Sequence, residues 1–222
     1  MMSKEVKVLA LIAVVIGAAV VFGASYYRDS KQSERKSSTA NTALMREDSA
    51  SIGPADAKVT VVEFYDPECE SCASVNPTVK KILKDHEGKV RLIVRYMPLH
   101  PNSMLAAVFT ESAGEQGKFW EAHDMLFEKQ PEWGERHGAP STDPKPDVKM
   151  LFERYAVELG VDPAKFDEAV KDQRFAAKLE RDKQDGKTLG VRQTPTFFVN
   201  GRQLARLTEA DLRALIDEEL KK

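Results

Sequence analysis

The pattern of apolar and polar positions predicts an α/β protein. Residues 58–65 (KVTVVEFY) are rich in β-branched and aromatic side chains, which is typical of a central strand buried on both faces. Residues 69–86 carry apolar side chains at helical spacing, and residues 89–97 form a second strand-like run. A strand, a helix and a strand joined so closely predict a right-handed unit with two parallel strands.

The middle of the chain, residues 101–189, has a mainly helical pattern of apolar positions. Gly117, the stretch 131–146 and Gly160 interrupt the pattern, because glycine and polar stretches separate helices. We therefore expect separate helices at residues 103–113, 118–128, 147–159, 163–172 and 175–189.

Strand character returns near the C-terminus. Residues 196–199 and 203–206 flank Asn200-Gly201, a dipeptide typical of tight hairpin turns. A final helix is expected after the N-cap residue Thr208, with apolar side chains on one face: Leu212, Leu215, Ile216 and Leu220. All these elements together predict a mixed sheet with helices on both faces.

The first 27 residues stand apart from this pattern. Residues 8–24 contain no charged side chain and are apolar on every face, which is typical of a membrane-spanning helix. Lys7 before the run and two tyrosines after it suit an anchor that stays in the membrane. A cleaved signal peptide is the alternative, because residues 23–25 (GAS) offer small side chains to signal peptidase.

Residues 28–50 are polar and rich in serine and lysine, as expected of a flexible linker. Basic residues are more frequent after the apolar run than before it, which opposes export of the C-terminal part. We nevertheless expect the domain on the periplasmic side of the inner (cytoplasmic) membrane, because long domains translocate despite flanking charge. The expected organisation is an anchor or signal sequence at 1–27, a linker at 28–50, a first half-domain at 51–100, a helical insert at 101–189 and a second half-domain at 190–222.

Composition and charge limit the classes of function. The 222 residues carry 33 basic and 35 acidic side chains, so the formal net charge is −2. Such a chain creates no field that would attract nucleic acid, and we expect none as a partner. Its length suits one core with an appendage.

Cys69 and Cys72 are the only cysteines, and they lie three positions apart. A bridge between them would close too small a loop to stabilise the fold much, so reactivity is the better explanation for the pair. The two residues follow a predicted strand and open a predicted helix, whose dipole and free amide groups favour a thiolate on Cys69. Cys72, one turn further on, can attack a mixed disulfide on Cys69 and release the substrate.

Metal binding is the competing interpretation of the two cysteines. A structural zinc site needs four ligands, and the histidines of the chain show no paired spacing: His86, His100, His123 and His137. Two thiolates alone suit a soft ion such as Cu(I), so a membrane-held Cu(I) chaperone remains an alternative function. Thiol exchange itself requires no cofactor, and we expect none.

Two further features accompany the cysteines. Glu63 interrupts a mostly apolar strand six residues before Cys69, where it can lie beneath Cys72 with a raised pKa and move the proton of the exchange. An exposed or ion-paired position at a sheet edge is the alternative. Thr194-Pro195 directly precedes a predicted strand, and this proline is either a cis-proline with a purpose or an ordinary loop proline.

Several sequence motifs are shared with a known family. VVEFY followed by DPECESC, then YMPLHPNS, KFWEAHDMLFEKQ and QTPTFFVNG, together resemble the DsbA-like thiol-disulfide oxidoreductases over about residues 52–220. The resemblance implies a thioredoxin fold with an inserted helical domain. It also implies that Cys69 is the nucleophile, Cys72 the resolving thiol, Glu63 a buried acid and Pro195 a cis-proline. Thr194 would then lie against the cysteines and pair with an extended substrate segment.

The resemblance further implies protein thiols or disulfides as substrates and a second redox protein that recharges the cysteines. Strongly oxidising members carry proline and histidine between the cysteines, whereas this chain has Glu70 and Ser71. A carboxylate at Glu70 is expected to raise the pKa of the thiol and make the disulfide less oxidising, so reductase or isomerase activity remains an alternative. Phe119, Trp120 and Phe127 are expected in the core of the insert rather than at the substrate.

Overall fold

The computed structural model describes residues 22–23, 25–27, 31, 42–135 and 146–222. The chain divides into two compact units, residues 1–42 and residues 43–222. Among the described residues, no helix is long and apolar enough to cross a membrane. The predicted apolar segment at residues 8–24 lies almost entirely outside the described residues.

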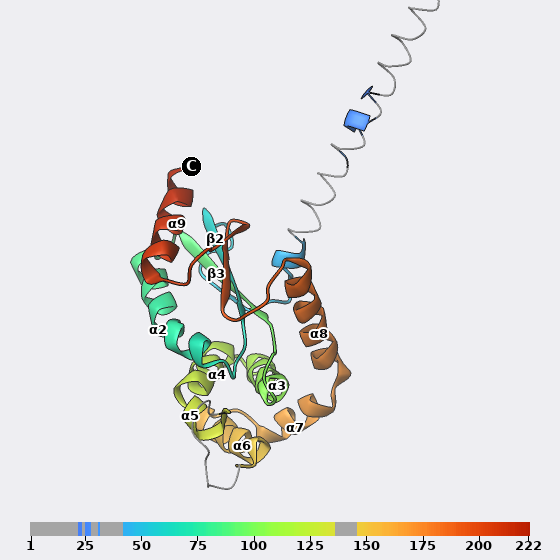
Figure 1. Ribbon diagram of the computed structural model, residues 1–222. Helices are drawn as coiled ribbons and strands as arrows, with labels where there is room; N and C mark the ends of the chain where they lie inside the picture. Colours follow the sequence, from blue (N-terminus) through green and yellow to red (C-terminus); the bar gives the residue numbers. More distant parts are fainter. Residues whose placement is uncertain (1–21, 24, 28–30, 32–41, 136–145) are drawn as a thin grey trace, which may run out of the picture. The chain divides into compact units, whose positions relative to one another are not determined.

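A mixed sheet with the strand order β1-β3-β2-β4-β5 forms the centre of the unit 43–222 (Figure 1). β2 (Val59–Tyr65) runs parallel to β3 (Val90–Tyr96) and antiparallel to β4 (Thr196–Val199). β5 (Arg202–Gln203) completes a hairpin with β4, and β1 (Ser51–Ile52) pairs with β3. The predicted parallel unit and the antiparallel hairpin are therefore confirmed, whereas the two-residue β1 was not predicted.

Helices cover both faces of this sheet (Figure 1). α2 (Glu70–Asp85) and α9 (Glu209–Lys221) cover one face, and α8 (Gln173–Thr188) packs on the other. Gly186 of α8 lies so close to the sheet that a β-carbon there would come within 3.2 Å of the Phe64 ring. The close approach of α8 explains why the second face of β2 is also apolar.

The side chains of β2 alternate between two buried clusters. Val61 and Tyr65 belong to the core beneath α2, whereas Val62 and Phe64 belong to the cluster on the α8 side. Successive side chains of a strand point to opposite faces. Glu63 therefore lies on the same face as Val61 and Tyr65, which is the face that α2 covers.

Between β3 and α8 the chain forms a helical insert. Aspartates begin two of its helices, since Asp147 accepts the backbone N–H of Met150 and Asp162 that of Ala164. All five helices predicted at residues 103–189 are confirmed to within two residues at each end, α8 among them. The short α5 was not predicted. The insert consists of α3 (Ser103–Gly114), α4 (Phe119–Glu128), α5 (Gln130–Trp133), α6 (Val148–Leu159) and α7 (Pro163–Lys171).

The aromatic residues predicted for the core of the insert pack there. Phe127 is buried, and its ring centroid lies 6.0 Å from that of Tyr65. Phe119 and Trp120 are half-buried against the same core.

The strand predicted at residues 203–206 is wrong at its end, because β5 stops at Gln203. The next residues are exposed or half-buried, and the N–H of Thr208 bonds to the carbonyl of Arg206 in a turn that leads into α9. The turn before β5 is as predicted. Asn200 and Gly201 have φ angles of 45° and 82°, the left-handed conformation that a tight hairpin requires.

The linker predicted at residues 28–50 is too long at its C-terminal end, because the folded unit begins at Ala43. The carbonyl oxygens of Ala43 and Leu44 accept hydrogen bonds of 2.5 and 3.0 Å from the fully buried Arg95. These contacts use backbone atoms of a polar segment, which its composition does not reveal.

We expect Arg95→Met to lower the free energy of unfolding by about 3–5 kcal/mol, because it leaves buried carboxylates without their cation. The Arg95 guanidinium lies 2.8 Å from Asp182 and 2.7 Å from Asp185. Urea denaturation followed by circular dichroism measures the loss. The matched control is Arg91→Met on the same strand, where the side chain donates to the Ser51 hydroxyl and the expected cost is about 1 kcal/mol. Equal losses in both variants would contradict the prediction.

Candidate active site

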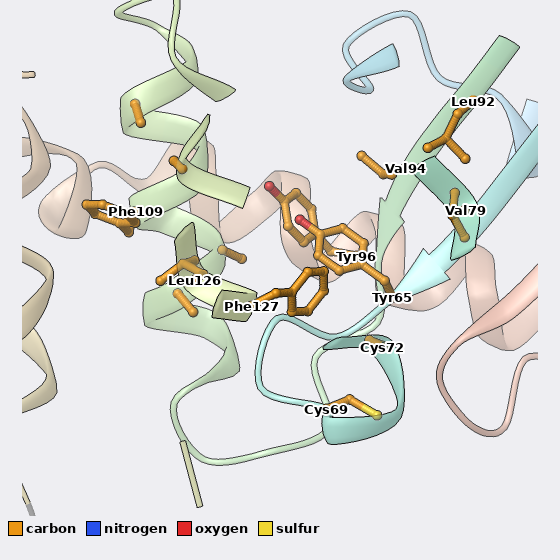
Figure 2. Close-up of a cluster of buried hydrophobic side chains, with 14 of the residues drawn as sticks. Tyr65, Cys69, Cys72, Val79, Leu92, Val94, Tyr96, Phe109, Leu126 and Phe127 are labelled. Atoms are coloured by element: carbon orange, nitrogen blue, oxygen red, sulfur yellow. The ribbon is translucent and has the colours of Figure 1, made fainter. Parts of the chain in front are cut away.

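The two cysteines lie at the start of α2, directly after the loop that follows β2 (Figure 2). Cys69 is the N-cap residue and has extended backbone angles, so its sulfur lies at the positive end of the helix. Cys72 lies within the first turn and is completely buried, whereas Cys69 retains 8% of its surface. Attack by an external sulfur is therefore directed to Cys69.

Hydrogen bonds to its sulfur lower the pKa of Cys69 to about 5. The bond from the Cys72 thiol contributes most and outweighs the opposing effect of burial. The side chain of Thr194 and the backbone of Ser71 and Cys72 contribute further bonds. Cys69 is thus a thiolate at neutral pH, which is the reactive form of cysteine.

The expectation that Glu70 raises the pKa of Cys69 does not hold for the site, because the net change is a decrease. Glu70 and Ser71 are both exposed to solvent. Solvent screens the charge of an exposed carboxylate, whereas the hydrogen bonds from Cys72 and Thr194 act directly on the sulfur.

The pKa of Cys72 changes in the opposite direction, well above its ordinary value. Burial is the main cause, and the hydrogen bond to Cys69 and the charge of Glu63 add to it. Cys72 therefore holds its proton at neutral pH and donates it to the Cys69 sulfur. Two neighbouring groups whose pKa values move apart can take separate roles in one reaction.

Aromatic rings lie on one side of the cysteines, toward the interior (Figure 2). The ring centroids of Tyr65 and Tyr96 lie 5.2 Å apart, and both side chains are buried. Their hydroxyl groups point away from Cys69 and Cys72 (Figure 2). The rings thus present carbon atoms to the cysteines and contribute to the burial that raises the pKa of Cys72.

Glu63 occupies the middle of β2, opposite Val94 of β3 and Phe197 of β4. It is 5% exposed, which excludes the alternative of an exposed edge position. Burial, followed by the charge of Cys69, raises the pKa of Glu63 to about 8. The carboxyl group is therefore mostly protonated at pH 7 and can exchange a proton with a sulfur atom.

The Thr194–Pro195 peptide bond is cis. The carbonyl oxygen of Thr194 lies 3.4 Å from Sγ of Cys69, although the two residues are 125 positions apart in the chain. The structure thus brings together all five residues that the sequence singled out: Glu63, Cys69, Cys72, Thr194 and Pro195.

The sequence analysis missed a buried carboxylate that fixes the loop between β2 and α2. Asp66 is completely buried. Its carboxylate accepts hydrogen bonds from the N–H groups of Glu68 and Leu99, from Nδ1 of His100 and from the Ser103 hydroxyl. Parallel strands end at the same edge of a sheet, so the positions of DPE after β2 and LHPNS after β3 were a usable signal.

Comparisons with known proteins identify the family of this chain. A family model described as Thioredoxin matches residues 45–218. Disulfide bond formation protein D of Bacillus subtilis is 30% identical over 177 residues, which cover 77% of this chain and 76% of that protein. The chain belongs to this thioredoxin family. It resembles the DsbA-like proteins in sequence and in fold.

Solved structures of DsbA-like and related proteins share its fold. BdbD from Bacillus subtilis, in its oxidised form, is similar with a TM-score of 0.67 and 29% identity, over 78% of this chain and 94% of that chain. Wolbachia pipientis alpha-DsbA1 has a TM-score of 0.70 and 18% identity, over 82% of this chain and 96% of that chain. The predicted thioredoxin-like fold with additional helices is therefore confirmed.

Some relatives of this DsbA-like chain are much longer proteins. The Na(+)/H(+) antiporter NhaA 3 of Salinispora tropica is 39% identical over 154 residues, which are 68% of this chain and 21% of that protein. The chain thus spans about a fifth of the length of this relative, and the similarity concerns one segment of it.

We expect alkylation of Cys69 by iodoacetamide to follow its pKa of about 5, so that the rate is half-maximal near pH 5. Cys72→Ala removes the hydrogen bond that contributes most and should move this midpoint to higher pH. Ser71→Ala keeps the backbone and both sulfurs, and should leave the midpoint in place. A midpoint above pH 7 in the reduced native protein would contradict the described geometry.

Proposed function

We propose that this protein is a membrane-tethered enzyme that transfers the Cys69–Cys72 disulfide to protein thiols outside the cytoplasm. The observation that carries the proposal is the opposite change in the two thiol pKa values, about 5 for Cys69 and well above the ordinary value for Cys72. The name of the Bacillus subtilis relative, disulfide bond formation protein D, supports the same direction of reaction.

The proposed reaction begins with the oxidised enzyme. A substrate thiolate attacks Sγ of Cys69, a substrate–Cys69 disulfide forms, and the Cys69–Cys72 bond breaks with its electron pair on Cys72. Cys72 then takes up a proton. A second substrate thiolate attacks the substrate sulfur of the mixed disulfide, so Cys69 leaves as a thiolate. Two substrate thiols are oxidised to one disulfide, and the enzyme disulfide is reduced to two thiols.

Glu63 is the proposed source of the proton for Cys72. Cys72 is a poor leaving group because its pKa is raised, and proton transfer from a neighbouring acid removes the charge that its buried surroundings oppose. The carboxyl group of Glu63 is buried on the same face of β2 and is mostly protonated at pH 7. Near its pKa of about 8, part of the Glu63 population is ionised, and this carboxylate can accept the proton in the reverse step.

The low pKa of Cys69 favours oxidation over the alternative of a reductase or isomerase. A stable thiolate stabilises the reduced enzyme, and a disulfide whose reduced form is stabilised is a stronger oxidant. Cu(I) transport, the other alternative, has no comparable support. Among the described residues, no group of three or more histidine, cysteine, aspartate or glutamate side chains is arranged to hold a metal ion.

The proposed substrate is an extended segment of a protein chain beside Thr194. The carbonyl oxygen of Thr194 lies 3.4 Å from Sγ of Cys69. Once Cys69 is bonded to a substrate sulfur, this carbonyl can accept a substrate N–H. A cleft of about 270 Å³ is lined in part by the two chain neighbours of Thr194, Gln193 and Pro195, and by Leu207.

The proposed tether is the apolar segment at residues 8–24, with its flanking lysine and tyrosines. A second redox protein is also required, because each proposed cycle leaves Cys69 and Cys72 reduced. A membrane partner at the same surface would meet the active site at a high effective concentration.

A stoichiometric transfer assay tests this function. The oxidised enzyme is mixed with a reduced peptide that contains two cysteines, and mass spectrometry follows the peptide disulfide. We expect one disulfide transferred per enzyme molecule and no transfer by Cys69→Ser. When reduced Cys72→Ser is mixed with the disulfide form of the peptide, Cys69 attacks that disulfide, a peptide thiolate leaves, and we expect to trap the mixed disulfide with acid. Transfer by Cys69→Ser at the wild-type rate, or none by the wild-type enzyme, would refute the proposal.

Glu63→Gln should slow disulfide transfer at pH 7 by about tenfold or more, because the amide cannot supply a proton to Cys72. The same variant should become more stable than wild type as pH rises. The folded-state pKa of Glu63 is raised from 4.5 to about 8, so wild type loses stability between these values and the glutamine variant does not.

The matched control for this variant is Glu111→Gln. Glu111 of α3 is another mostly buried carboxyl with a raised pKa, but its partner is Lys178 of α8, at 2.7 Å. We expect transfer by Glu111→Gln at the wild-type rate. An unchanged rate in Glu63→Gln, measured by stopped-flow fluorescence, would eliminate Glu63 as the proton donor.

A further inference from the structure

We infer that His100 is a positioning residue of this active site: anchored by Asp66, its imidazolium stabilises the Cys69 thiolate and makes the redox equilibrium of the pair depend on pH. This inference rests on the proposed function, because it requires Cys69 and Cys72 to alternate between a disulfide and a dithiol. The residues between the two cysteines, Glu70 and Ser71, carry no positive charge that could stabilise the thiolate.

Asp66 holds the His100 ring in a fixed position. Nδ1 of His100 lies 2.8 Å from Oδ2 of Asp66. The same oxygen accepts the N–H groups of Leu99 and His100 at 2.6 and 3.2 Å, and the other oxygen of Asp66 accepts the Ser103 hydroxyl. Asp66 is completely buried, so one carboxylate holds both the ring and its backbone.

Backbone hydrogen bonds connect Asp66 to both cysteines. The carbonyl oxygen of Asp66 accepts the N–H of Cys69 at 3.1 Å. A backbone hydrogen bond from Asp66 to Cys72 favours the thiolate of that residue. Asp66 therefore contacts His100 through its carboxylate and both cysteines through its backbone, which fixes the imidazole relative to the reacting sulfurs.

The charges around the imidazole ring determine the pKa of His100. Burial lowers the pKa of His100. The hydrogen bond to Asp66, followed by the negative charges of Asp66, Cys69 and Glu68, more than offsets it, and the net change is upward. Two titrating groups affect each other equally. Because the Cys69 thiolate stabilises the imidazolium, the imidazolium stabilises the thiolate by the same free energy.

The consequence is a redox equilibrium that responds to pH. The pKa of His100 is raised in the reduced protein, so the ring is charged at pH 6 and loses its proton as pH rises through that pKa. Above it, the negative charges of Asp66 and Glu68 act on the thiolate without compensation by the ring. The reduced enzyme is therefore favoured more strongly below the His100 pKa than above it.

The first experiment uses the unaltered protein. The ring protons of His100 are titrated by NMR in the oxidised and in the reduced enzyme. We expect a lower midpoint in the oxidised enzyme, because the Cys69 charge is absent there. His86 is the internal control, because it binds the Ile82 carbonyl and Asp217 near the far end of α2 from the cysteines. Identical His100 midpoints in the two redox states would overturn the inference.

The second experiment uses His100→Gln, with His86→Gln as the matched control. The equilibrium of each enzyme with reduced and oxidised glutathione is measured at pH 6 and at pH 9. We expect His100→Gln to disfavour the reduced enzyme about two- to fivefold at pH 6, as for a partly exposed charge pair, and to match wild type at pH 9. His86→Gln should match wild type at both values.

The pattern of results separates the possible failures. A difference that is equal at pH 6 and pH 9, or no difference at either, would overturn the role of the His100 charge. If glutathione cannot convert the wild-type enzyme between two redox states at all, the proposed function itself fails.

Discussion

The chemistry of this protein depends on one hydrogen bond, from the Cys72 thiol to the sulfur of Cys69. Together with burial of Cys72, the bond divides two chemically identical groups into a thiolate and a thiol: the pKa of Cys69 is about 5, and that of Cys72 is well above its ordinary value. It can form only because the first turn of α2 separates the residues by three positions and buries the second completely. Every other feature of the site either supports this division or uses it.

The fold supplies the surroundings that maintain the division. The central position of β2 between two neighbouring strands and the cover of α2 leave Glu63 only 5% exposed, so its carboxyl group is mostly protonated at pH 7. The buried Asp66 fixes the loop before Cys69 to the segment after β3, and Thr194 closes the site from the opposite end of the chain. Three distant parts of the sequence thus converge on two sulfur atoms.

The elements that carry the site were predictable because they follow simple periodic rules. The apolar run of β2, the helical repeat of α2 and the turn at Asn200-Gly201 each depend on local sequence, and the structure agrees with them. The site residues Cys69 and Glu63 stood out as polar or reactive groups at the end or centre of such runs.

Other features were not predictable, because they depend on contacts between distant segments. Residues 43–50 have the composition of a linker, but buried Arg95 binds their backbone. The pKa of Cys69 was expected to rise because of Glu70, yet hydrogen bonds from Cys72 and Thr194 lower it. The residue types alone do not show which backbone carbonyl accepts a hydrogen bond, or to which atom a thiol donates its proton.

The reduction potential of the Cys69–Cys72 couple tests the central claim most directly, because a stabilised Cys69 thiolate makes the disulfide oxidising. Equilibration with glutathione at pH 7, followed by quantification of both redox forms, gives this value. The account predicts a potential closer to about −120 mV, the range of strong thiol oxidants, than to the value of about −270 mV for thioredoxin. A potential at or below that of thioredoxin would contradict it.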